Sequence, residues 1–216
     1  MLTLDGFLDL LQAYNTAIWP MQVVANILGL IALISVFVSY RKANLVVLTV
    51  LSFLWLWTGS MFCLVYWTAL SKPAYLFGVM FIVQGILFVP MISQTKLSFR
   101  FVPSRYSLLG LVLIAYAMVG YPIVGNMLNH IFPRSLPFGV VPCPTTIFTI
   151  GMLLLTDKPF PRYLATIPLV WSLFGVVPVM RGIGEDIGLV LSGIVGIVFL
   201  VLRGNMGQSA ASAATN

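Results

Sequence analysis

Seven apolar segments separated by short polar stretches constrain the fold of this chain more than any other feature of its sequence. Most of them are close to the ~20 residues that a helix needs to cross about 30 Å of hydrocarbon. The segments are residues 19–40, 43–70, 74–92, 106–128, a stretch within 137–156, 163–180 and 187–202. Only 7% of the residues are charged, against about 25% in soluble domains. We therefore predict an all-α integral membrane protein with seven transmembrane helices, whose partner is the lipid bilayer.

The distribution of lysine and arginine predicts which way the helices face. With seven crossings, the polar connections alternate between the two sides of the membrane. One side carries eight basic residues and the other three: Arg41, Lys42, Lys96, Arg100, Arg105, Lys158, Arg162 and Arg203 against Lys72, Arg134 and Arg181. Because basic loops stay in the cytoplasm, the N-terminus is predicted outside and the C-terminus inside. Basic residues scattered singly or in pairs form no stripe for nucleic acid, so no nucleic-acid partner is expected.

The two ends of the chain are predicted to flank a seven-helix domain of residues 19–203. In residues 1–18, four apolar side chains fall on one helical face: Leu4, Phe7, Leu8 and Leu11. This pattern is typical of an amphipathic helix that lies on the membrane interface. Residues 204–216, GNMGQSAASAATN, are small and polar, which predicts a disordered cytoplasmic tail.

The stretch NHIFPRSLPFGVVPCPTTIFTIG, residues 129–151, interrupts this apolar pattern. Pro142 and Pro144 disfavour helical geometry in the residues before them, so the fifth helix is predicted to be broken near Pro142–Pro144. A helix from Pro144 to Thr156 spans roughly 20 Å, about 10 Å less than the hydrocarbon core. The preceding residues would then dip into the membrane, which is tolerated only against protein or a water-filled cavity. A helix that starts at Pro137 and kinks is the open alternative.

Eight polar or reactive side chains are predicted to face an outward vestibule at this broken helix. They are His130, Arg134, Cys143, Thr145, Thr146, Arg181, Glu185 and Asp186. Free N–H groups at residues 145–147 would favour an anion or a carbonyl oxygen there. Ionisable groups inside a membrane mark ion paths or ligand contacts, and broken helices form substrate sites in secondary transporters. The simpler interpretation also stays open, in which Glu185 and Asp186 stabilise a helix N-terminus and His130 and Arg134 are interfacial groups.

The inventory of reactive residues limits the chemistry of this vestibule. One histidine and two cysteines do not supply the three or four protein ligands of a usual metal site, so no metal and no cofactor is predicted. Cys63 lies midway along the second apolar segment, at a different expected depth from Cys143, so no disulfide is expected. Enzymatic activity is the least supported class, because His130 or Glu185 offers a base without a matched nucleophile.

The run FGVVPCPTTIFTIGMLLL, residues 138–155, with the upstream NMLNHIFPRSLP and the downstream GIGEDIGLVLSG, resembles an uncharacterised family of small seven-helix bacterial inner-membrane proteins. The motif that carries the resemblance is Phe-Gly-x-x-Pro-Cys-Pro-x-Thr-Ile-Phe, and the match covers most of the chain. The resemblance implies a bacterial cytoplasmic membrane. It implies no established activity.

Two functional hypotheses follow. The first is a small transporter or channel-like protein for a small polar or anionic solute, with a polar cavity lined by Cys143, Thr145, Thr146, Glu185 and Arg181. The second is a non-transporting membrane sensor or scaffold, whose outer charges only close the bundle. It predicts that Arg181 pairs with Glu185 or Asp186 and that no continuous cavity exists.

Overall fold

The computed structural model describes residues 3–38, 40–93, 97–157 and 160–214, in which the regular secondary structure is helical, apart from one isolated β-bridge between Phe99 and Thr156. Of residues 40–41 and 203–214, only the backbone is described. The α-helices are α1 (Leu4–Ala17), α2 (Met21–Val38), α3 (Tyr40–Trp57), α4 (Ala74–Ile92), α5 (Arg105–Ala115), α6 (Tyr121–Met127), α7 (Pro142–Leu154), α8 (Tyr163–Phe174), α9 (Val176–Met180) and α10 (Ile187–Ala214). Short π-helical segments η1 (Thr58–Tyr66) and η3 (Tyr116–Gly120), and 3-10 turns η2 (Trp67–Ala69) and η4 (Gly184–Asp186), connect some of them.

Six of the helical segments in the described residues are long and apolar enough to cross a membrane. They are Met21–Val38, Lys42–Ala69, Ala74–Ile92, Arg105–Met127, Tyr163–Met180 and Gly184–Leu202. The remaining predicted segment contains α7, which has only 13 residues and therefore spans about 20 Å. The described residues thus form an all-helical membrane protein, in which six helices are of membrane-spanning length and α7 is a shorter apolar helix.

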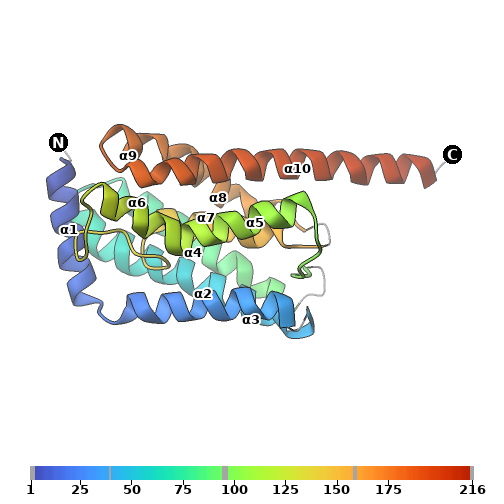
Figure 1. The fold of residues 1–216 in the computed structure, drawn as a ribbon, viewed down its shortest axis with the longest axis horizontal. Coiled ribbons are helices and arrows are strands. Elements are labelled where there is room, and N and C mark those ends of the chain that lie inside the picture. Colours follow the sequence, from blue (N-terminus) through green and yellow to red (C-terminus); the bar gives the residue numbers. More distant parts are fainter. Residues whose placement is uncertain (1–2, 39, 94–96, 158–159, 215–216) are drawn as a thin grey trace.

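The spanning helices run side by side, and α1 lies across one end of the bundle (Figure 1). We call this end, with α1 and the connections 70–73, 128–141 and 181–183, the α1 end. The connecting residues 97–104, 155–157 and 160–162 lie at the opposite end, called the far end. Lys96 and Lys158, which the charge count places on the cytoplasmic side, are outside the described residues, as are the side chains of Arg41 and Arg203.

Helix α1 packs on the bundle through its apolar face. The four residues predicted to share that face are buried or pack against the core: Leu4, Phe7, Leu8 and Leu11. Next to them, the hydroxyl of Tyr14 is 2.7 Å from the carbonyl oxygen of Val140 and donates a hydrogen bond to it. Burial raises the pKa of the Tyr14 phenol well above its usual value, which keeps the hydroxyl a donor. The side chains of α1 therefore hold the connection that leads into α7.

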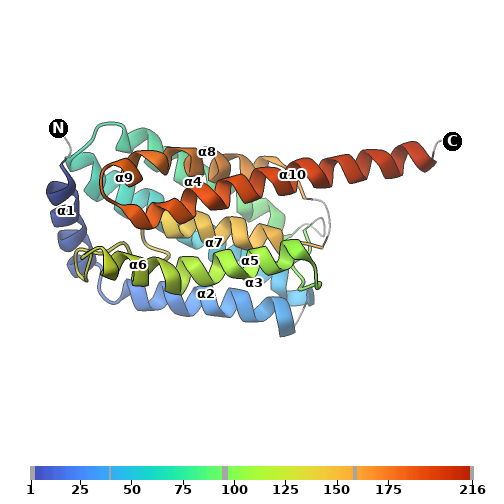
Figure 2. The same cartoon turned by 45° about the horizontal axis from the view of Figure 1, so that its top comes forward.

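Helix α7 occupies the centre of the bundle, and all of its residues are buried. Figure 2 shows it between α5 on one side and α8 on the other, and α10 and α3 also contact it. Its backbone approaches α5 closely at paired glycines, because a Cβ on Gly151 would lie 2.8 Å from the carbonyl oxygen of Gly110. Small residues permit this kind of contact between membrane helices. On the opposite face, the indole nitrogen of Trp55 donates to the hydroxyl of Thr149 over 2.8 Å.

The connection before α7 enters the bundle instead of staying on its surface. Phe138 is buried against Gly29, where an added Cβ would be 2.6 Å from the Phe138 ring. Gly29 lies eight residues past the start of α2 at Met21, or about 12 Å along the helix. Gly139, the residue after Phe138, has a φ of +77°, a conformation that glycine adopts without strain. Val141 is extended, and α7 begins at Pro142, two residues before the predicted start.

Helix α10 continues to Ala214, over most of the segment for which the small polar residues predict a disordered tail. Alanine has the highest helix propensity, and the sequence SAASAA within residues 209–214 is compatible with a continued helix. The division of the chain at residue 203 remains a prediction.

Candidate functional site

Two neighbouring acidic side chains are buried at the α1 end of the bundle. Glu185 and Asp186 belong to η4, the short turn between α9 and α10, and each is only 1% exposed. The turn is formed by Gly182, whose φ is +102°, and by a hydrogen bond of 3.0 Å from the Ile183 amide to the carbonyl of Pro178. Buried carboxylates are costly unless other groups compensate them, so the partners of each acid indicate what this site can do.

Glu185 is held by His130 and Tyr116. The Nδ1 atom of His130 lies 2.8 Å from Oε1 of Glu185, and both side chains are almost fully buried. The hydroxyl of Tyr116 donates to the backbone carbonyl of Glu185 over 2.7 Å. The second carboxylate oxygen, Oε2, is buried without a hydrogen-bond partner among the described residues. Gly125 leaves room for the pair, since a Cβ there would be 3.2 Å from Oε1.

Asp186 is held by Tyr121 and Cys143 from two other helices. The hydroxyl of Tyr121 donates to Oδ1, and the thiol of Cys143 donates to Oδ2 over 3.3 Å. Cys143 is the second residue of α7, so this contact attaches the start of the central helix to η4. Tyr121 is 1% exposed and Cys143 7%. Both oxygens of Asp186 therefore already accept hydrogen bonds from protein groups.

The two tyrosines are site residues that the sequence analysis did not identify. They lie at the two ends of one irregular region, because Tyr116 opens the π-helical η3 and Tyr121 follows it directly. Pro122 lacks the N–H group that would continue regular helical bonding, and π-helical turns inside α-helices are often found at functional sites. The sequence Gly120-Tyr121-Pro122 in the middle of an apolar segment was the signal that could have indicated this region.

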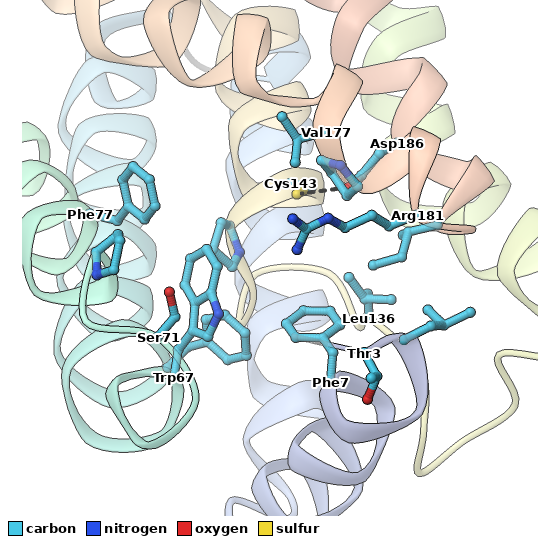
Figure 3. Close-up of a pocket in the computed structure, with 16 residues that line it drawn as sticks. Thr3, Phe7, Trp67, Ser71, Phe77, Leu136, Cys143, Val177, Arg181 and Asp186 are labelled. Atoms are coloured by element: carbon cyan, nitrogen blue, oxygen red, sulfur yellow. Dashed lines mark hydrogen bonds between the residues drawn. The ribbon is translucent and has the colours of Figure 1, made fainter. Parts of the chain in front are cut away.

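A cavity of about 270 Å³ lies beside the pair formed by Cys143 and Asp186 (Figure 3). This volume is just below the ~300–1,000 Å³ of usual small-molecule pockets. Its walls are mostly apolar and come from α1, η1, η2, α4, the connection before α7, and α9, with Phe7, Phe62, Trp67, Phe77, Leu136 and Val177 among them. Several lining residues are exposed, including Thr3, Pro73 and Val177. The cavity therefore opens to the surface between the starts of α1 and α4 and helix α9.

Arg181 is the basic residue of this cavity. Figure 3 shows its guanidinium group extending into the cavity below Cys143. Among the described residues, the structure contains no ion pair between Arg181 and either Glu185 or Asp186. The pairing expected for a scaffold is therefore wrong, because both acids are occupied by other partners and the arginine side chain turns towards the cavity.

Five of the eight predicted site residues do not line the cavity, and three of these, Arg134, Thr145 and Thr146, also take no part in the contacts of the buried acids. Arg134 is on the surface, where its guanidinium lies 2.8 Å from Asp9 of α1. Thr145 and Thr146 are buried, and their hydroxyls donate to the carbonyls four residues earlier, those of Val141 and Pro142. The structure therefore brings together Cys143, Arg181 and Asp186 at the cavity and adds the pair of His130 and Glu185 behind it.

The prediction that residues 145–147 have free N–H groups is also wrong. Because α7 begins at Pro142, the amides of residues 145–147 fall within its regular hydrogen bonding to carbonyls four residues earlier. The two prolines in the first turn have no N–H groups to offer. The predicted polar character of the cavity is wrong as well, since Thr145, Thr146 and Glu185 do not line it and most of its walls are apolar.

The thiols and carboxylates of the described residues can donate and accept protons, but they are not grouped as the ligands of a metal ion would be. Cys63 and Cys143 are both free and buried. Within the described part of the chain, no group of three or more histidine, cysteine, aspartate or glutamate side chains is arranged to hold a metal ion.

A second cavity, of about 210 Å³, lies at the far end of the same central helix. Polar groups contribute to its lining, among them Arg100, Ser104, Ser107 and Asp157, and Leu154 of α7 borders it. Cys143 and Leu154 are eleven residues apart, or about 16 Å along the helix. The fully buried α7 therefore separates two cavities that open at opposite ends of the bundle.

Comparison of the sequence with known proteins gives a family but no activity. Searches of curated proteins and of solved structures returned no match. A family of unknown function, DUF6064, matches residues 4–211, nearly the whole chain, which confirms the resemblance to an uncharacterised family noted from the sequence. The chain belongs to this family of unknown function, DUF6064.

Proposed function

We propose that this protein binds a small amphiphilic solute in the cavity at the α1 end and acts as a small membrane transporter. The observation that carries the proposal is the cavity itself, which combines apolar walls with three polar groups at one side: Cys143, Arg181 and Asp186. Pockets of this kind, largely apolar with a few convergent polar groups, are the usual form of small-molecule sites.

The proposed setting is a bacterial cytoplasmic membrane with the α1 end outside. The excess of lysine and arginine in the segments that the sequence assigns to the cytoplasmic side supports this orientation. We further propose that the chain crosses the membrane seven times, with α7 as the short crossing and the connection before it dipping into the bilayer. The position of Phe138 beside Gly29 supports such a dip, because irregular backbone at that depth is shielded by protein.

Reactivity of Cys143 tests whether the cavity is accessible. The variant Cys63→Ala leaves Cys143 as the only cysteine, and Cys143→Ala leaves only Cys63, which is fully buried. A small membrane-impermeant thiol reagent added from outside is expected to label Cys143 many times faster than Cys63. Equal and negligible labelling of both would contradict an accessible cavity.

Blocking the cavity gives a matched control for this experiment. Val177 and Val176 are adjacent on α9 and similarly exposed, 48% and 46%, but only Val177 lines the cavity. In the Cys63→Ala background, Val177→Trp is expected to slow the labelling of Cys143, whereas Val176→Trp is expected to leave it unchanged. Equal effects of the two variants would show that the reagent reaches Cys143 by another route.

The second cavity favours transport over simple binding. A transporter of this type opens its two ends in turn around a central element, and α7 has a cavity at each end. Ser107 lines the far cavity and is 5% exposed, so Ser107→Cys in a background without the two native cysteines reports on that side. A solute that protects Cys143 is expected to change the labelling rate at position 107. If that rate stays constant, the protein binds its solute without transporting it.

A membrane sensor or scaffold is the second candidate, and the pairing of Glu185 with His130 favours it. This pair is buried, connects the end of α6 with η4, and would close the bundle without any ligand. A scaffold has no need of a reachable Cys143, so the labelling experiment separates the two candidates.

A further inference from the structure

We infer that the cavity at the α1 end binds a single-chain amphiphile whose head group is an anion, a carboxylate or a phosphate. This inference rests on the proposed function and adds to it the charge of the solute. Its basis is the difference between the polar groups around the cavity that already have partners and those that do not.

Two acceptor side chains at the cavity, those of Asp186 and Thr3, already have partners. Asp186 uses one carboxylate oxygen for the hydroxyl of Tyr121 and the other for the thiol of Cys143. Thr3 accepts a hydrogen bond from the amide of Gly6 as the cap of α1. Each oxygen can accept a second hydrogen bond, but Asp186 is only 1% exposed. A cationic head group would therefore have to move neighbouring side chains before it could bind this carboxylate.

The donors at the cavity are not occupied. Arg181 forms no ion pair among the described residues. The indole nitrogen of Trp67 is buried, with no hydrogen-bond partner in the described part of the chain. Figure 3 shows that the guanidinium of Arg181 and the indole of Trp67 both face the space between them. A buried donor without an acceptor, such as the Trp67 nitrogen, is uncommon in native proteins. Arg181 is an exposed residue, and its guanidinium matches the geometry of a carboxylate or phosphate.

The rest of the cavity is suited to a hydrocarbon chain. Phe7, Phe62, Phe77 and Leu136 supply apolar surface, and the exposed Val177 marks an open side of the cavity at α9. A cavity of about 270 Å³ accommodates a head group and the first part of one chain, with the remainder emerging beside α9. A two-chain phospholipid does not fit within it.

Protection of Cys143 against the thiol reagent tests this inference with probes that differ only in their head group. The Cys63→Ala protein is placed in phosphatidylcholine nanodiscs and labelled in the presence of dodecanoate, dodecyl phosphate, dodecanol or dodecyltrimethylammonium. The two anions are expected to protect Cys143 at concentrations about tenfold or more below the concentration of dodecanol that is needed. A factor of about ten is the gain in affinity expected from a hydrogen bond to a charged group. Inorganic phosphate and acetate are included, because protection by either would show that the chain is not needed and would overturn the amphiphile.

Variants at the two donors identify the groups responsible. Arg181→Gln is expected to remove the preference for the anions over dodecanol, and Arg181→Lys to restore part of it. Trp67→Phe is expected to weaken anion protection while dodecanol still protects. Arg134→Gln is the control, because Arg134 pairs with Asp9 on the surface and does not line the cavity. A preference that survives Arg181→Gln contradicts the inference.

The possible outcomes separate this inference from the proposed function. Equal protection by dodecanol and by the anions leaves a binding site but overturns the anionic head group. Better protection by dodecyltrimethylammonium also overturns it and points to Asp186 as the binding group. Protection by none of the probes, with Cys143 still reactive, contradicts an amphiphile site altogether and overturns both.

Discussion

The two ends of helix α7 are held in different ways. At its N-terminal end, side chains from distant parts of the chain converge on buried acids, and Cys143 bonds to Asp186. At its C-terminal end, backbone hydrogen bonds hold the helix in place. Arg100 N donates to Leu155 O and Asp157 N donates to Ser98 O, each over 3.1 Å. Backbone pairing is available to almost any sequence, whereas buried acids demand specific partners. We therefore expect the side chains at the N-terminal end of α7 to serve the function of the protein as well as its stability.

Among the variants that test this difference between the two ends of α7, Asp186→Ala is expected to change the free energy of unfolding most. The substitution leaves the buried hydroxyl of Tyr121 and the buried thiol of Cys143 without their acceptor. Each buried unsatisfied group costs about 1–3 kcal/mol, so the loss of the acceptor for both groups should lower the free energy of unfolding by about 2–6 kcal/mol. Denaturant unfolding of the protein in detergent, followed by fluorescence, measures this change.

Asp186→Asn is the matched control for that measurement. The amide keeps one acceptor oxygen and nearly the same shape, so most of the stability should remain. If Asp186→Ala is as stable as the native protein, the acid network does not hold the N-terminal end of α7.

The middle of α7 is expected to show the next largest effect, because it is packed tightly against α5. In Gly151→Ala the new methyl group would meet the carbonyl of Gly110 at 2.8 Å, and in Gly110→Ala it would meet the carbonyl of Gly151 at 2.7 Å. Overpacking of this kind costs about 1–3 kcal/mol, measured as a lower unfolding midpoint. Since the two glycines touch, the double variant should differ from the sum of the single ones. Additive losses would mean that the helices do not meet at this point.

At the far end, Asn44→Ala is expected to have a smaller and more local effect. The side chain of Asn44 donates to the carbonyl of Leu97 and accepts from the amide of Phe99, the latter over 2.8 Å. Losing these two bonds in a half-buried position should cost about 1–2 kcal/mol. Hydrogen exchange at the amide of Phe99 should accelerate, while labelling of Cys143 at the other end should not change. Faster labelling of Cys143 would show that the two ends are coupled through α7.

The sequence predicted the parts of this structure that repeat along the chain. The lengths of the apolar runs predicted the membrane-spanning helices, and the spacing of Leu4, Phe7, Leu8 and Leu11 predicted the buried face of α1. Both depend on periodic burial, which a sequence displays directly. The prolines around Cys143 also marked the start of a short helix, although the start was expected two residues later than Pro142.

The composition of the site could not be predicted in the same way, because it depends on contacts between distant residues. Tyr121 and Asp186 are 65 positions apart, and Tyr14 and Val140 are 126 apart, so no local pattern connects them. Trp67, whose indole faces the cavity, is one of several aromatic residues in its segment, and its spacing does not distinguish it from an interfacial residue. Charge alone also gave the wrong partner for Arg181.

The smallest effect is expected from Arg134→Ala, also at the α1 end. Arg134 lies four residues after His130 and pairs with Asp9 at the same distance of 2.8 Å that joins His130 to Glu185. The difference is exposure, since the side chains of Arg134 and Asp9 are 37% and 69% exposed. Exposed ion pairs contribute about 0.2–1 kcal/mol, and salt screens them. The unfolding free energy should therefore fall only slightly, and by less at high salt.

The connection 128–141, which contains Arg134, has a stronger attachment to α1. This attachment should mask the loss of the ion pair between Arg134 and Asp9. The buried side chain of Asn15 donates to the carbonyls of Pro133 and Ser135 over 2.7 and 2.8 Å. A double-mutant cycle between Arg134→Ala and Asp9→Ala isolates the ion pair from this background. A coupling free energy well above 1 kcal/mol would mean that the pair behaves as a buried one. The α1 helix would then lie closer to the bundle, or deeper in the membrane interface, than its exposed acids imply.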